Sequence, residues 1–165
     1  MLWNTHQVLT LTDAFLQPEP GTITHWPADL GSAVAGTWSI EIPLQPWSAD
    51  DEMAPDSYRP GSDGPELIQT SIRLEFITLP ADSLDQLSGR LVTFPPNPRP
   101  GFAEGTIYLL ACHCPITVNS ITFGAIADDQ ITADLDLAFD FARAGGIDIH
   151  NRDADLRVVL RPTSR

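Results

Sequence analysis

The feature that most constrains this fold is an alternation of apolar and polar residues that recurs along the whole chain. Successive side chains of a β-strand point to opposite faces, so a two-residue repeat is typical of strands with one buried face. Stretches with the helical repeat of 3.6 residues are nearly absent. The sequence therefore predicts an all-β protein, an antiparallel β-sandwich or flattened barrel of roughly eight strands.

Residues 36–44, 67–79 and 131–141 show the alternation most clearly. The side chains expected to face the core are Trp38, Ile40, Ile42 and Leu44 in the first stretch, Ile68, Ile72, Leu74 and Phe76 in the second, and Ile131, Leu135, Leu137, Phe139 and Phe141 in the third. Residues 154–160 alternate in the same way. Aspartates of the third stretch and arginines of the fourth are expected to form cross-strand ion pairs, each worth a few tenths to about 1 kcal/mol.

The organisation expected from these patterns is a single all-β domain covering residues 1–165, which is long enough to bury one continuous core. Residues 81–89 suggest one short helical turn, with Asp82 or Ser83 as its cap and Gly89 as its stop. Residues 45–66 contain six acidic residues and one arginine among many Pro, Ser and Gly. They are expected to form a long acidic loop, a type of segment that is uncommon in compact domains and often functional.

The charge balance is the most unusual global property of the chain. It has 22 acidic residues, 9 arginines and no lysine, which gives a net charge of −13. Residues 1–82 hold 12 of the acids and 2 of the arginines, a net charge of −10. The electrostatic field of such a charge repels nucleic acids and anionic membrane surfaces and favours basic partners. A high net charge can also have no role other than keeping the protein soluble. We expect no nucleic-acid partner and no membrane partner.

Several classes of protein are excluded by composition. Phosphate-binding Walker loops, protein kinases, Schiff-base enzymes and the serine acylases that use a lysine all need an amine that this chain lacks. No apolar run approaches the roughly 18 to 20 residues of a membrane span. The first residues resemble no signal peptide, and two cysteines form no disulfide framework, so we expect a cytoplasmic location.

The tripeptide Cys112, His113 and Cys114 raises the question of a metal site or a reactive thiol. On a strand, residues two apart lie about 6.5 Å from each other, beyond the roughly 3.5 to 4.5 Å between the Cβ atoms of a disulfide, and His113 points the other way. A structural zinc site needs a second pair of ligands that the chain lacks. We interpret the tripeptide as part of a buried strand.

A second group of chemically interesting residues lies near the C-terminus. Its members, weak candidates for metal ligands around a turn at Asn151, are Asp148, His150, Asp153 and Asp155. Asp and Asn are common in turns because their side chains bond the local backbone, so a plain turn is the favoured interpretation. We therefore expect no metal and no cofactor. Glu41, Glu75 and Glu104 could form an acid–base pair, but their separation is not readable from the sequence.

These observations favour a binding protein over an enzyme. The primary hypothesis is an acidic protein that captures a basic protein partner, as bacterial immunity proteins and other inhibitors block a cationic active site. The residues assigned to this surface are Trp47, Asp50, Asp51, Glu52, Asp56, Tyr58 and Asp63. Three alternatives stay open: a small-molecule or carbohydrate binding module using Trp26 and Trp47, a metal-dependent hydrolase centred on His150, and a structural component that forms a homo-oligomer.

Overall fold

The computed structural model describes residues 11–48, 67–109, 112–144 and 149–163, and it is dominated by one eight-stranded sheet. The strand order is β6-β8-β7-β5-β2-β1-β10-β9, and β8 also pairs with β9. The strands are β1 (Gly21–His25), β2 (Trp38–Pro43), β5 (Ser71–Ile77), β6 (Leu91–Thr93), β7 (Ala103–Leu109), β8 (Cys112–Ala127), β9 (Gln130–Phe139) and β10 (Arg152–Thr163). The prediction of an all-β fold is confirmed.

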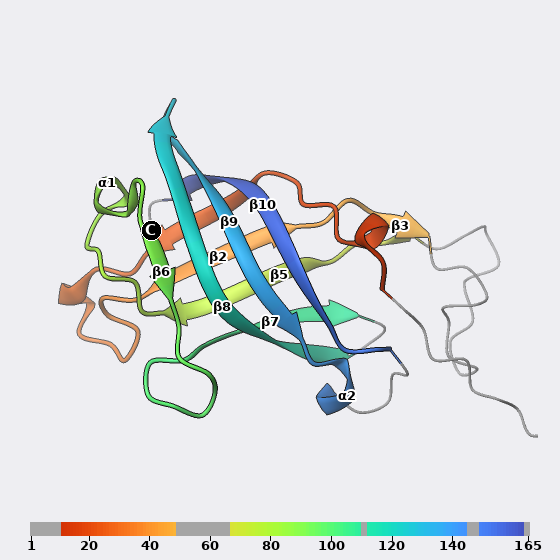
Figure 1. The fold of residues 1–165 in the computed structure, drawn as a ribbon. Coiled ribbons are helices and arrows are strands. Elements are labelled where there is room, and N and C mark those ends of the chain that lie inside the picture. Colours follow the sequence, from red (N-terminus) through yellow and green to blue (C-terminus); the bar gives the residue numbers. More distant parts are fainter. Residues whose placement is uncertain (1–10, 49–66, 110–111, 145–148, 164–165) are drawn as a thin grey trace, which may run out of the picture.

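The pairing of β8 with β9 closes every strand except β6 into a seven-stranded barrel. β9 follows one edge of β8 from Ile116 to Ala127, while β7 and then β6 share the other edge. In Figure 1 the long strands β8, β9 and β10 (cyan to blue) run steeply across the direction of β2 and β5, as tilted strands on opposite walls of a barrel do. Among the described strands of the barrel, neighbours are antiparallel except β1 and β10, which are parallel.

The remaining elements are short. A two-stranded ribbon of β3 (Trp47–Ser48) and β4 (Leu67–Ile68) brackets residues 49–66, which lie outside the described residues. The helical elements are η1 (Asp13–Phe15), η2 (Ala28–Leu30), α1 (Leu84–Leu87) and α2 (Phe141–Ala144). α1 confirms the helical turn predicted at residues 81–89: Ser83 is its N-cap residue, and Gly89 follows with a φ of 71°. In the part of the chain that the structure describes, no helix is long and apolar enough to cross a membrane.

The barrel interior is filled by apolar side chains that come from alternate positions of its strands. Trp38, Ile42 and Leu135, three of the side chains expected to face the core, are at most 2% exposed, whereas Ile68 is only partly buried. Phe141 is also fully buried, although it lies in α2 and not in a strand. Within the described segments no polar or charged residue is buried. At Gly105 of β7 the paired residue on β5 covers the backbone so closely that a Cβ atom would stand 2.4 Å from Leu74 Cδ2.

Phe76 is the clearest departure from the expected pattern. The sequence places it on the inner face of its strand, but its side chain is 46% exposed. The cause is a β-bulge: Trp38 pairs with Ile77 and Ile40 pairs with Leu74, so two residues of β5 stand opposite Ser39 alone. Phe76 has a positive φ of 59°, and Ile77 takes the buried position instead. The bulge therefore turns one aromatic ring onto the outer surface.

The outer face of β9 and β10 contains both an attractive and a repulsive charge pair. Arg157 lies opposite Asp134, and their side chains form an ion pair at 3.5 Å, as the sequence predicts. Asp155, by contrast, lies directly opposite Asp136. Like charges in facing positions of neighbouring strands destabilise a sheet.

We expect the substitution Asp155→Asn to raise the free energy of unfolding by a few tenths to about 1 kcal/mol, because it removes the repulsion from Asp136. Urea unfolding measured at low and at high salt tests this, and the gain should shrink at high salt. The matched control is Asp134→Asn, which removes an attractive pair and should lower stability slightly. Equal gains from both substitutions would mean that net charge, and not the facing pair, is responsible.

Candidate functional site

The acidic surface assigned from the sequence lies mostly outside the described residues, since Asp50, Asp51, Glu52, Asp56, Tyr58 and Asp63 all fall within 49–66. Trp47 is described, and it is buried instead of exposed as a partner-facing residue would be. Its side chain is only 8% exposed because β3 pairs with β4 and because its ring packs edge-on against Phe15, with ring centroids 4.8 Å apart. A ring covered in this way has little surface to offer to a partner.

The weak metal candidates near the C-terminus that the structure describes do not form a cluster. Asp148 lies outside the described residues, and the side chains of His150, Asp153 and Asp155 are exposed. Across the described ranges, no three His, Cys, Asp or Glu side chains gather closely enough to hold a metal ion. The Asn151 side chain instead accepts a hydrogen bond from the backbone N–H of Ala142 at 2.9 Å. That contact ties the segment before β10 to the first turn of α2.

The Cys–His–Cys tripeptide forms the first residues of β8, as the sequence predicts. Cys114 points into the barrel and is 0% exposed, whereas His113 lies exposed on the outer face. Burial, and secondarily the charge of Cys112, raise the pKa of the Cys114 thiol from 9.0 to about 11. The folded state therefore holds this proton more tightly, and the resulting stability is fully present below pH 9.0 and is lost as the pH rises towards about 11.

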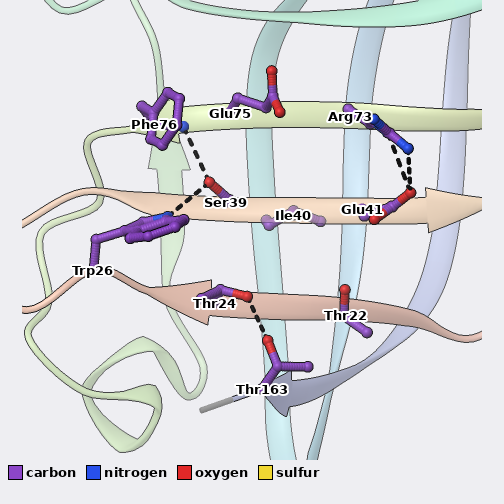
Figure 2. A pocket seen from close by; sticks show the side chains of 10 residues that line it. All are labelled: Thr22, Thr24, Trp26, Ser39, Ile40, Glu41, Arg73, Glu75, Phe76 and Thr163. Carbon is purple, nitrogen blue, oxygen red and sulfur yellow. Dashed lines mark hydrogen bonds and ion pairs between the residues drawn. The ribbon is translucent and has the colours of Figure 1, made fainter. Parts of the chain in front are cut away.

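The side chains with the most evident binding geometry line an open groove on the outer face of β1, β2 and β5. The groove has a volume of about 560 Å³. Residues two apart on each strand point outward together, so three neighbouring strands present one continuous polar surface. Figure 2 shows these side chains, and they include Thr22 and Thr24 of β1, Ser39 and Glu41 of β2, and Arg73 and Glu75 of β5. Thr163, from the parallel strand β10, closes one side through a hydrogen bond to Thr24.

Two aromatic rings form one end of the groove. Trp26 follows β1 directly, and Phe76 is turned outward by the bulge in β5; their ring centroids are 5.7 Å apart. Ser39 fixes both, because its hydroxyl oxygen accepts hydrogen bonds from the Trp26 indole N–H at 3.0 Å and from the Phe76 backbone N–H at 3.3 Å. Figure 2 shows the two rings on either side of Ser39. The Ser39 hydroxyl therefore ties the Trp26 ring and the Phe76 backbone together at this end of the groove.

A charged pair lies at the other end of this groove. The Arg73 guanidinium donates from Nε to Glu41 Oε1 at 3.2 Å, and its Nη2 lies 3.1 Å from the same oxygen. Nε also approaches the Ser71 hydroxyl at 3.3 Å. Both charged side chains are about half exposed, at 56% for Arg73 and 47% for Glu41, so a ligand can reach their polar atoms. With Glu75 included, the groove carries two carboxylates and one guanidinium.

Comparison of the chain with protein-family models, with curated proteins and with solved structures finds no match in any of the three. The geometry of the described surface is therefore the basis for any functional assignment.

Sequence reasoning identified only part of this groove. The sequence offers Trp26 as part of a possible binding module, and it lies half-buried at the groove's end. The alternation predicts Phe76 in the core, because nothing in its own strand indicates the bulge. Glu41 and Glu75 stand out as acids, but the sequence does not bring them together. The alternation predicts which residues of each strand point outward. It does not predict that β1, β2, β5 and β10 are neighbours in the sheet.

The raised pKa predicts that Cys114 is inert. In the native protein a thiol-specific reagent at neutral pH should leave Cys114 unmodified, because the thiolate is the reactive species and burial disfavours it. Labelling of the variant Cys112→Ala, followed by mass spectrometry, isolates the Cys114 signal. Modification should appear only after unfolding in urea. Rapid labelling of the native variant would mean that the thiol is accessible and ionised, and would restore the case for a reactive cysteine.

Proposed function

We propose that this chain is a non-enzymatic binding protein whose outer groove holds a neutral, hydroxyl-rich ligand, with carbohydrate as the ligand class. The observation that carries the proposal is one exposed surface on which the Trp26 and Phe76 rings adjoin a field of hydroxyl and charged side chains. The carbohydrate alternative weighed from the sequence thus gains support at Trp26, though not at Trp47.

A sugar ring has the two kinds of surface that this groove can contact. Its hydroxyl groups both donate and accept hydrogen bonds, and the groove offers acceptors on Glu41, donors on Arg73 and groups that do both on Thr22. Its C–H faces are apolar and slightly positive, and they pack against the electron-rich face of an aromatic ring. Phe76, at 46% exposure, presents such a face.

Other ligand classes fit the lining less well. A phosphate or other strong anion would meet two carboxylates and a single guanidinium that is already paired with Glu41. A wholly apolar ligand would leave the charged pair without water or hydrogen-bonding partners, which carries a free-energy cost. A neutral polyol avoids both penalties.

We expect neutral oligosaccharides of glucose, mannose or xylose to bind in a glycan-array screen and to be measurable by isothermal titration calorimetry. Phe76→Ala should weaken the affinity about tenfold, because ring stacking contributes about 1 kcal/mol beyond buried area and area is lost as well. Leu91→Ala is the matched control, since Leu91 is 62% exposed on β6 and lies outside the groove. Absence of binding to every sugar, or equal affinity of the Phe76 variant, contradicts the proposal.

Capture of a basic protein is the second candidate, favoured by the net charge of −13 and the net charge of −10 in residues 1–82. This proposal concerns residues 49–66 and is independent of the groove. A variant with Asp50, Asp51, Glu52, Asp56 and Asp63 changed to amides should lose binding to poly-L-lysine, used as a basic probe, and to any basic protein retained in native mass spectrometry. Wild-type binding should weaken as salt rises. Binding that survives both high salt and the five substitutions rules out electrostatic capture.

A further inference from the structure

We propose that the ligand is a linear oligosaccharide of several units that lies along β5 and occupies two adjoining hollows. This inference rests on the proposed carbohydrate function and adds to it the length and shape of the ligand. It follows from a second hollow that continues the first one across the charged pair of Glu41 and Arg73.

The second hollow lies on the outer face of β2, β5, β7 and β8, and it has a volume of about 570 Å³. Glu41 and Arg73 line both hollows, so the two share a border and no strand separates them. The new part of the lining includes Ser71, Thr106 and Gln69, whose side chains donate and accept hydrogen bonds. The second hollow adds no carboxylate beyond Glu41, so it too suits a neutral polyol.

A second aromatic pair forms the far end. Tyr108 of β7 lies directly opposite His113 of β8, with ring centroids 4.8 Å apart. The Tyr108 side chain is 50% exposed, and the Thr70 hydroxyl donates a hydrogen bond to the Tyr108 carbonyl at 2.6 Å, which ties this part of β7 to the residue preceding β5. The two hollows therefore form one longer groove, which has an aromatic pair at each end and the charged pair of Glu41 and Arg73 in its middle.

The distance between the two ends sets the size of the ligand. Ile72 pairs with Ile107, so Tyr108 stands beside Ser71 at one end of β5, while Phe76 stands near the other. At a rise of about 3.3 Å per residue, the strand between Ser71 and Phe76 spans roughly 16 Å. This is longer than one sugar ring, so a monosaccharide touches one aromatic pair only. A linear chain of several units contacts both, with the charged pair bonding its central hydroxyls.

The test is a series of oligosaccharides of increasing length, built from whichever sugar among glucose, mannose and xylose the wild-type protein binds, and titrated by calorimetry. In the wild-type protein the affinity should rise with length and then level off once both ends are occupied. Tyr108→Ala should lower the affinity for the longest oligomer about tenfold and leave the affinity for the shortest unchanged. Tyr108→Phe, which keeps the ring, should retain most of the gain with length. Phe76→Ala should weaken the binding of long oligomers in the same experiments.

The possible outcomes distinguish failure of the extended ligand from failure of the carbohydrate function. If oligomers of every length bind equally well and Tyr108→Ala has no effect, the ligand occupies one hollow and the inference is wrong, while the carbohydrate function stands. If Tyr108→Ala weakens short and long oligomers alike, the second hollow is the primary site and an extended ligand is again excluded. If no oligomer binds the wild-type protein, both the inference and the carbohydrate function fail.

Discussion

The pairing of β8 with β9 closes the sheet, and this closure gives the protein one inner face and one outer face. A sheet that closes on itself satisfies the backbone hydrogen bonds along both edges of each strand and leaves one inner and one outer face. The inner face is packed with side chains such as Phe123, Leu135 and Leu160, which are at most 1% exposed. The two open hollows, by contrast, lie on the outer face.

Irregularities in the barrel are what make the outer face of β1, β2 and β5 distinctive. The bulge in β5 turns Phe76 outward, and the hydroxyl of Ser39 then holds this residue and Trp26 in place. The parallel approach of β10 adds Thr163 from the far end of the chain. The outer face formed by β9 and by residues 153–157 of β10 carries mainly aspartates and arginines. The aromatic pair therefore depends on a local departure from a regular strand, whereas the hydroxyl-rich surface comes from the ordinary alternation of outward side chains.

Much of the fold could be predicted from the sequence, because alternation is a local property. Strands β2, β9 and β10, the turn at α1 and the burial of Cys114 all follow from residues close together in the chain. The site could not be predicted in this way. The bulge at Phe76 depends on how β5 pairs with β2, and the burial of Trp47 depends on β4 and Phe15. Which strands become neighbours is a property of the whole sheet. The groove is formed by four strands, so it could not be predicted from any one of them.

The most direct test of this account is to locate the bound ligand by NMR during a titration with an oligosaccharide. If the groove is the binding site, the indole N–H of Trp26 and the backbone amides of Phe76 and Ser71 shift together and saturate at one concentration. Amides of β9, and amides of β10 around Asp155, should stay unchanged. Shifts confined to residues 49–66, or to the aspartate-bearing face around Asp136 and Asp155, would contradict the assignment of the groove as the binding site.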